Sequence, residues 1–343
     1  MSEQKTYTVV IVGATGLVGQ GMIQVLEDRG FPVGELRLAA SERSMGKSLT
    51  FRNEPVELQL LNEAVFQNAD IALFAVDAPV SAEWVPVAAR HCGVVIDNSS
   101  HFRMNEDVPL VVPEVNPNDI FDYKTNIIAN PNCSTIQMVA ALKPIWDTYG
   151  LQRIIVSTYQ AASGAGQPGV DHLRAELRGE NPDTPAFPHS LLANPIPHIS
   201  SFNNDGLSKE ELKMIHETRK IFHDDSILVS PTCVRVPIMN CHAESIVIET
   251  AEPYELGDVR SLLSDAPNIV VIDDVENAQY PLPSEADGKD EVFVGRLRRD
   301  AVFPNGLAMW VVADNVRKGA ATNAVQIAEQ WVQRKHTEIP TGK

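Results

Sequence analysis

The sequence predicts an α/β protein in two parts, an open and mostly parallel sheet covered by helices, followed by a mixed α+β domain. Short apolar runs recur through residues 7–129, a glycine-rich turn joins the first run to a helical pattern, and strand-like runs crowd together after Cys133. At about 100–200 residues per domain, 343 residues suffice for two domains, each with its own core.

The first domain opens on a strand. Residues 7–12 form a β-branched run that ends at a glycine cluster, after which apolar residues follow helical spacing from Leu17 to Leu26. Alternation of strand and helix predicts a mostly parallel sheet with helices on both faces. The further short apolar runs lie at 36–40, 71–76, 94–96 and 127–129.

After Cys133 the pattern changes. Residues 134–149 have helical spacing and 153–159 read as a strand, whereas 181–197 hold five prolines and predict a surface loop. Strands joined by hairpin-like links are expected in the remainder, which makes this half α+β. These strand-like runs lie at 226–230, 245–250, 269–272, 291–297 and 307–313.

Two further helices are predicted in this half. One covers residues 208–222, where Ser208 and Glu211 match the capping box that begins many helices. The other follows the last strand, at about 316–334, and we expect it to pack back on the first domain.

Composition excludes several classes of protein. Lys and Arg number 28 against 45 Asp and Glu, a net charge of −17, so the surface repels phosphate backbones and anionic lipids. No apolar run approaches the roughly 18 residues of a membrane span, and the start lacks signal-peptide features. Four cysteines without paired ligand spacing predict reduced thiols and no metal site. We therefore expect a cytoplasmic protein that binds neither nucleic acid nor membranes.

The glycine-rich turn predicts a dinucleotide site. Gly13-Ala-Thr15-Gly16-Leu17-Val18-Gly19 joins strand to helix, where a pyrophosphate rests on N–H groups at the helix start. Gly13 permits the turn, Gly16 a close approach and Gly19 helix–strand packing. The spacing is a variant of the usual fingerprint, and such glycines also serve chain reversal alone.

The end of the second strand favours NADP over NAD. An NAD enzyme places Asp or Glu there, but this chain has Ser41, Arg43 and Ser44. Serine and arginine suit a ribose 2′-phosphate. Glu42 argues against this interpretation, and a solvated loop arginine is the alternative.

Cys133 is the candidate nucleophile. It lies in Asn130-Pro-Asn-Cys-Ser-Thr-Ile136, where an irregular turn meets a helix, and a helix N-terminus stabilises thiolate over thiol. Free cysteine is otherwise a small buried apolar residue, which is our interpretation of Cys92 and Cys233.

Motifs occur over nearly the whole chain, at Gly13–Gly19, Ser41–Ser44, Asn98–Arg103, Pro131–Cys133, Gln160–Gly166, Arg235–Pro237 with His242, and Asp314–Ala321. Together they make the sequence resemble the aspartate-semialdehyde dehydrogenase family. The resemblance implies NADP, a homodimer and a Rossmann-type domain over 1–132, completed by a helix over 316–338. A catalytic and dimerisation domain would cover 133–315.

The implied reaction is NADPH-dependent reductive dephosphorylation of aspartyl β-phosphate to aspartate semialdehyde, a step toward lysine, methionine and threonine. Cys133 attacks the acyl carbon, inorganic phosphate leaves and hydride reduces the thioester. By resemblance His242 is the base and Gln160 orients the acyl intermediate. Ser163, Gly164 and Asn315 bind the cofactor.

A doubly charged substrate needs local cations in an acidic chain. The resemblance assigns Arg103 to phosphate, and we assign Arg235 to the α-carboxylate. It also places Asn132, Glu210 and Lys213 at the substrate site, although an i,i+3 ion pair would explain Glu210 and Lys213 equally well.

Two alternatives stay open. One is reduction of N-acetylglutamyl phosphate, whose acetylated substrate has no ammonium for Glu210 to pair with. The other is a non-catalytic nucleotide-binding homologue, which has no need of a reactive Cys133. The sequence also leaves open whether Cys241, directly before His242, affects the site.

Overall fold

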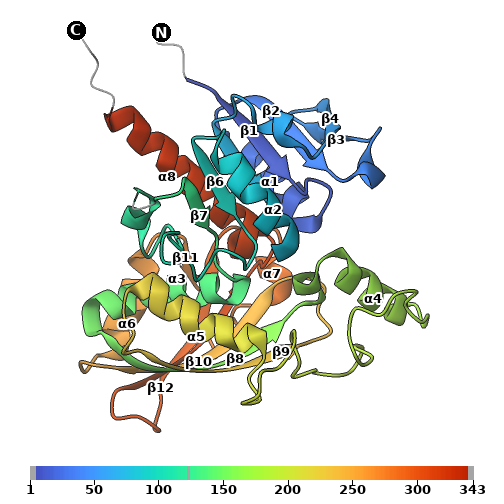
Figure 1. The fold of residues 1–343 in the computed structure, drawn as a ribbon. Coiled ribbons are helices and arrows are strands. Elements are labelled where there is room, and N and C mark those ends of the chain that lie inside the picture. Colours follow the sequence, from blue (N-terminus) through green and yellow to red (C-terminus); the bar gives the residue numbers. More distant parts are fainter. Residues whose placement is uncertain (1–4, 122–123, 339–343) are drawn as a thin grey trace. The chain divides into compact units, whose positions relative to one another are not determined.

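The structure is a computed structural model that describes residues 5–121 and 124–338, with side chains to residue 334. Its backbone forms two compact units (Figure 1). Unit 1 runs to Pro131 and resumes at Ala320, and unit 2 is Asn132–Gly319. Residues 1–4 and 122–123 of the expected first domain lie outside the described residues.

Unit 1 contains the predicted open sheet, with strand order β3-β4-β2-β1-β5-β6-β7. Every neighbouring pair from β4 to β7 is parallel, and β3 alone runs antiparallel at the edge. The strands are β1 (Tyr7–Val12), β2 (Val33–Ala40), β3 (Ser48–Phe51), β4 (Glu54–Leu60), β5 (Ile71–Phe74), β6 (Val94–Asp97) and β7 (Ile127–Ala129).

The β3–β4 hairpin is absent from the sequence prediction. Its turn residues Arg52 and Asn53 have φ values of 51° and 65°. Two successive positive φ angles are the geometry of a tight hairpin turn that usually contains glycine. Because Arg52, and not glycine, stands at the first position, the sequence does not indicate this turn.

The α-helices in the described residues of unit 1 are α1 (Leu17–Asp28), α2 (Ala78–Ala89) and α8 (Thr322–Glu338). The C-terminal α8 packs beside α1, where Arg29 pairs with Glu329 at 2.7 Å. Its Trp331 is buried in the core of this unit. The helix begins at Thr322, later than the 316 expected, because a π-helical turn occupies Arg317–Ala321.

Unit 2 is built on a mixed sheet with strand order β11-β12-β13-β10-β8-β9. Neighbours are antiparallel except β8 with β9 and β11 with β12. The fold class is therefore confirmed. The strands are β8 (Leu151–Gln160), β9 (Leu228–Arg235), β10 (His242–Thr250), β11 (Ile269–Val271), β12 (Val292–Arg299) and β13 (Gly306–Ala313).

The helices of unit 2 are α3 (Cys133–Tyr149), α4 (Gln167–Leu177), α5 (Lys209–Phe222), α6 (Leu256–Asp265) and α7 (Pro283–Ala286). Helix α3 packs on β8, β10 and β13, and α5 packs on β9 and on α3 (Figure 1). The predicted capping box is confirmed, since Ser208 accepts from the Glu211 N–H and Glu211 accepts from the Ser208 N–H.

The expected hairpin link at 226–230 is wrong. That strand is β9, which extends to Arg235 and runs parallel to β8. Parallel neighbours require a crossover connection, and α5 lies in this one. Among the described residues, no helix has both the length and the apolar character that a membrane crossing requires.

Candidate active site

Three predicted site residues lie side by side at one end of strands β8, β9 and β10 in the unit 2 sheet. In the β8–β9 register Gln160 lies opposite Arg235, and the β8–β10 register continues past Ala243 and Tyr159 to bring His242 beside Gln160. All three side chains are at least 96% buried, with exposures of 1%, 4% and 0%. We refer to these three candidate site residues, Gln160, Arg235 and His242, as the catalytic row.

Ala161 links two members of this row through its backbone. Its N–H donates to Nδ1 of His242 at 3.0 Å, and its carbonyl accepts from Nη1 of Arg235 at 2.6 Å. A Cβ atom on Gly164 would lie 2.4 Å from Nη1 of Arg235 and 3.0 Å from Nε2 of His242. Glycine therefore lets the chain approach both groups, and any side chain here would displace them.

The imidazole of His242 is neutral over the physiological range. Burial and the charge of Arg235 lower its pKa to about 3, against the opposing effect of Glu210. Because Nδ1 accepts from Ala161, the proton of the neutral ring is assigned to Nε2. His242 thus presents a donor, Nε2–H, on the Gly164 side.

Cys133 is the first residue of α3, as the sequence predicted for the helix start. Asn132 is the N-cap, and its Oδ1 accepts from the N–H groups of Ser134 and Thr135 at 3.1 and 3.4 Å. A Cβ on Gly319 would lie 2.9 Å from Cβ of Cys133. The candidate nucleophile Cys133 therefore lies on a capped helix terminus with backbone close beside it.

Cys133 also differs from the other cysteines in exposure. It is half-buried, whereas Cys92, Cys233 and Cys241 are buried. Burial raises the pKa of Cys92 to about 12 and raises those of Cys233 and Cys241 as well. Buried, protonated thiols are unreactive, so Cys133 is the reactive candidate.

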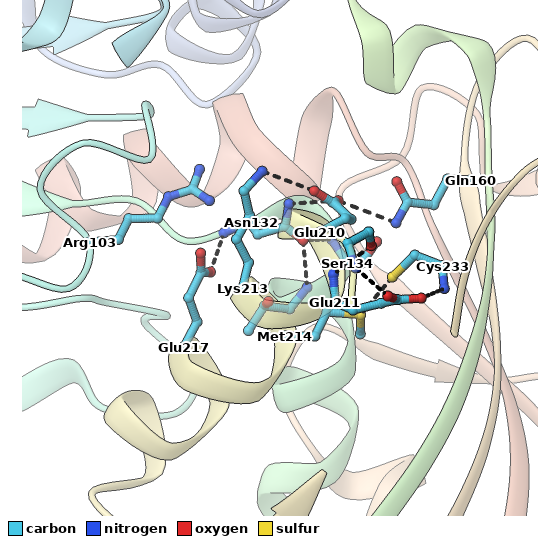
Figure 2. A network of polar contacts seen from close by, with 12 residues as sticks. Arg103, Asn132, Ser134, Gln160, Glu210, Glu211, Lys213, Met214, Glu217 and Cys233 are labelled. Atoms are coloured by element: carbon cyan, nitrogen blue, oxygen red, sulfur yellow. Dashed lines mark hydrogen bonds and ion pairs between the residues drawn. The ribbon is translucent and has the colours of Figure 1, made fainter. Parts of the chain in front are cut away.

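Helix α5 brings Glu210 and Lys213 to this site (Figure 2). Glu210 Oε1 accepts from Nδ2 of Asn132 at 2.9 Å and from Nε2 of Gln160 at 3.3 Å, while Oε2 pairs with Nζ of Lys213 at 2.9 Å. Burial acts to raise the pKa of Glu210, but Lys213, Asn132 and Arg235 outweigh it and lower the pKa to about 2. Glu210 is therefore ionised, and it joins the catalytic row to the helix cap.

Sequence reasoning missed Glu217. It lies seven residues after Glu210 on the same face of α5, and Oε2 accepts the backbone N–H of Asn132 at 2.7 Å (Figure 2). Only 1% of its surface is exposed. Helical spacing from Glu210 and Lys213 was the available signal.

The predicted cofactor residues of unit 2 form a separate hydrogen-bonded group. Asn315 donates from Nδ2 to Oγ of Ser163 at 3.0 Å, and its Oδ1 accepts the N–H of Cys241 at 3.0 Å. Cys241 adopts φ of 70°, and its side chain packs with Ala243 and Phe293. Strand alternation places those side chains on the sheet face opposite His242, so the Cys241 thiol faces away from the catalytic row.

In unit 1 the glycine turn has the geometry of an anion site. Gly13 has φ of 81°, and a Cβ there would lie 2.4 Å from the carbonyl of Ala75. A Cβ on Gly19 would lie 2.2 Å from the carbonyl of Gly13. Helix α1 begins at Leu17, next to Val18, and its N-cap Gly16 offers no side-chain bond. First-turn N–H groups without a side-chain cap suit a pyrophosphate.

The remaining predicted residues of unit 1 follow strand ends. Ser41 and Arg43 are exposed just beyond β2, with Ser44 half-buried, and Thr15 is exposed in the glycine turn. Arg103 is 7% exposed beyond β6, and its Nη2 donates to the carbonyl of Asn98 at 2.9 Å. In such sheets ligands usually bind at the carboxyl ends of the parallel strands.

Two family models match the chain, the semialdehyde dehydrogenase NAD binding domain over residues 8–123 and the dimerisation domain over 142–318. Aspartate-semialdehyde dehydrogenase of Aquifex aeolicus is 55% identical over 95% of this chain and 98% of its own length. Aspartate-semialdehyde dehydrogenase 2 of Vibrio cholerae is 50% identical over 97% and 99%.

Solved structures agree with these relatives. Aspartate semialdehyde dehydrogenase II of Vibrio cholerae, complexed with ASA, has a TM-score of 0.92 at 49% identity over 96% of this chain and 99% of that one. The Candida albicans enzyme with NADP has a TM-score of 0.73 at 26% identity over 96% and 99%. The sequence resemblance is confirmed, and the chain belongs to the aspartate-semialdehyde dehydrogenase family.

Proposed function

We propose that this protein reduces L-aspartyl 4-phosphate to L-aspartate 4-semialdehyde, with release of phosphate and use of NADPH, in the biosynthesis of lysine, methionine and threonine. The observation that carries the proposal is the combination of a half-buried Cys133 on a capped helix start with a neutral His242 in the adjoining sheet. It is supported by the family and by the relatives' names.

Cys133 is the proposed nucleophile. Its Sγ attacks the acyl carbon, the bond from that carbon to the phosphate oxygen breaks, and the electron pair leaves with phosphate. The N-terminus of α3 favours the thiolate that this attack requires. After reduction of the thioester, the carbon–sulfur bond breaks and the thiolate is restored as the aldehyde leaves.

His242 is the proposed donor to the reacting oxygen. Negative charge develops on that oxygen when the acyl carbon becomes tetrahedral, and Nε2–H is the hydrogen-bond donor that the ring presents. The base role expected from the resemblance requires a proton to be accepted at Nε2. That can happen only if Nδ1 releases the Ala161 N–H, so we assign the donor role.

Charged groups would anchor the two ends of the substrate. Arg235 presents a buried guanidinium beside His242, which suits the α-carboxylate, and the ionised Glu210 suits a free ammonium. Gln160, held by Glu210 and Thr158, would orient the acyl group. We assign phosphate to Arg103 in unit 1.

The chain's residues fit NADP. The uncapped first turn of α1 would hold the pyrophosphate, and Arg43 with Ser41 and Ser44 would contact the 2′-phosphate. Ser163, Gly164 and Asn315 would contact the nicotinamide end. When bound, the cofactor supplies the hydride. We further propose a homodimer formed through unit 2, supported by the match of its residues to a dimerisation domain; the cytoplasmic location stays a prediction.

One assay tests this function. Aspartate semialdehyde, phosphate and NADP should give NADPH absorbance at a rate that vanishes without phosphate. N-Acetylglutamate semialdehyde should be a poor substrate, because it has no ammonium for Glu210. A faster rate with the acetylated aldehyde would support the alternative reductase, and no turnover with an unreactive Cys133 would indicate a non-catalytic homologue.

A further inference from the structure

A second row of side chains lies next to the catalytic row, two residues further along the same three strands and on the same face of the unit 2 sheet. Glu244 lies opposite Thr158 in the β10–β8 register, and Thr158 lies opposite Cys233 in the β8–β9 register. Each is two residues along its strand from His242, Gln160 and Arg235 respectively, so the rows are about 6.6 Å apart. Glu244 therefore lies beneath His242.

Glu244 is fully buried, and neither carboxyl oxygen has a partner at ordinary hydrogen-bond geometry among the described residues, although the Gln137 amide lies nearby. Buried carboxyl groups almost always have partners, because an unsatisfied polar group costs about 1–3 kcal/mol. The mechanism proposed above gives this residue no role. Its position beneath a catalytic histidine therefore needs an explanation.

Gln137 is the polar neighbour of Glu244. Its Nε2 donates to the backbone carbonyl of His242 at 3.5 Å, whereas no described residue donates to its Oε1. Gln137 lies one helical turn after Cys133 on α3, so its amide joins the nucleophile's helix to the start of β10. A donor to Oε1 would hold this amide in place.

The surroundings of Glu244 disfavour its charge. It faces Thr158 from β8, Val311 from β13, Cys233 from β9 and Gln137 from α3, with His242 on its own strand. Among these, only Cys233 and His242 titrate. At neutral pH Cys233 is a protonated thiol and His242 is an unprotonated imidazole, so both are uncharged. Burial raises the pKa of Glu244 well above its usual value, and a side-chain hydrogen bond that the Gln137 amide would donate to the carboxylate offsets this only in part.

We propose that Glu244 is a neutral carboxylic acid that acts as a positioning residue, donating its proton to Oε1 of Gln137 so that Gln137 holds the backbone carbonyl of His242. The chain of donors then runs from the Glu244 hydroxyl to Gln137 Oε1, and from Gln137 Nε2 to the His242 carbonyl. Only the protonated acid supplies the first donor. The catalytic part of this proposal rests on the proposed function, but the protonation of Glu244 does not.

The competing arrangement is an ionised Glu244 that accepts from the Gln137 side-chain amide or from a helix hydroxyl. Ser134 lies three residues before Gln137 on the same face of α3, and its buried Oγ has no hydrogen-bond partner within the described part of the chain. An ionised Glu244 would leave Gln137 Oε1 without that donor. The charge state of Glu244 therefore separates the two arrangements.

The first experiment measures protonation by infrared difference spectroscopy and by pH-dependent unfolding of wild type and Glu244→Gln. A carboxylic-acid C=O band should be present at neutral pH in wild type and lost in the variant. The unfolded state ionises above its ordinary pKa while the folded state holds the proton, so wild type loses stability as pH rises. The unfolding constant of wild type relative to Glu244→Gln should rise about tenfold per pH unit between these two pKa values.

Glu57→Gln is the matched control, because Glu57 is exposed on β4 and its loss removes one carboxyl from the surface. It should leave the carboxylic-acid band in place, and the difference in stability between Glu57→Gln and wild type should not change with pH. A Glu244→Gln spectrum identical to that of wild type, or a stability gap independent of pH, would overturn the neutral acid.

The second experiment measures steady-state kinetics. Glu244→Gln retains a donor and should retain kcat within about threefold, whereas Glu244→Leu removes it and should lower kcat about tenfold or more with little change in either KM. Equal kcat in Glu244→Leu and wild type would overturn the positioning role. If Glu244→Leu does not fold, the infrared and unfolding measurements still decide the charge state. Wild type that lacks dehydrogenase activity would refute the proposed function and leave the protonation test intact.

Discussion

Glu217 accepts the backbone N–H of Asn132 through Oε2 at 2.7 Å, from a position 85 residues later in the chain. Asn132 in turn caps the helix that begins at Cys133, and its side chain donates to Glu210. Two carboxylates of α5 thus bind the backbone N–H and the side-chain amide of the residue directly before Cys133. Through Asn132, the orientation of α5 determines where the thiol lies.

Glu217→Ala should destabilise the protein by about 1–3 kcal/mol, because it leaves a buried N–H without its acceptor. It should also lower kcat, since the Asn132 cap and Cys133 lose their support. Glu217→Gln keeps an acceptor oxygen and should cost less in both measurements. Thermal unfolding and steady-state kinetics check this, with Lys209→Ala on the exposed part of α5 as control. Unchanged kcat in a folded Glu217→Ala variant would contradict the expectation.

Cys133→Ser should abolish dehydrogenase activity while leaving folding and NADP binding intact, because a hydroxyl is a far weaker nucleophile than a thiolate at neutral pH. Activity, circular dichroism and cofactor titration measure the three properties. Cys92→Ser is the matched control, since Cys92 is buried in unit 1. If well-folded Cys133→Ser kept more than a small fraction of the rate, the covalent mechanism would be wrong.

Arg43→Ala should raise KM for NADP about tenfold or more, because a lost charge-assisted contact costs about 1.5–3 kcal/mol. KM for NAD should hardly change, since NAD has no 2′-phosphate. The exposed Arg90 of unit 1 offers a control, Arg90→Ala, that removes the same charge. Equal losses with both cofactors, or equal losses in both variants, would show that Arg43 acts elsewhere.

His242 should make the folded state sensitive to acid. Its pKa is lowered to about 3 in the folded protein, whereas the unfolded chain takes up the proton below its usual value of 6.5. Stability is therefore lost as pH falls from 6.5 toward 3, by about 1.4 kcal/mol per pH unit.

His242→Asn removes this titration. The unfolding free energy of the variant minus that of wild type should therefore increase by about 2 kcal/mol as pH falls from 6.5 to 5. Denaturant unfolding at several pH values measures the difference. Glu210 adds acid sensitivity below about pH 4.5, but equally in both proteins. Parallel pH profiles for the two proteins would mean that folding does not lower the pKa of His242.

Local signals in the sequence predicted much of the fold. The glycine turn between β1 and α1, the helix that begins at Cys133 and the capping box of α5 each depend on residues a few positions apart. Such elements form from steric limits and short-range hydrogen bonds, which a sequence displays directly. The β3–β4 hairpin was not predicted, because Arg52 stands where glycine usually marks the turn.

The sequence by itself determined the residue types of the site and the helix start that carries Cys133. Only the tertiary structure decided that Gln160, Arg235 and His242 form one row, since strand register depends on partners far apart in the chain. Packing of α5 on α3 brought Glu217 to Asn132, a contact that no local pattern specifies. Burial, which exists only after these elements pack, lowers the pKa of His242 and raises that of Glu244, because removing water from a charged group disfavours its charge.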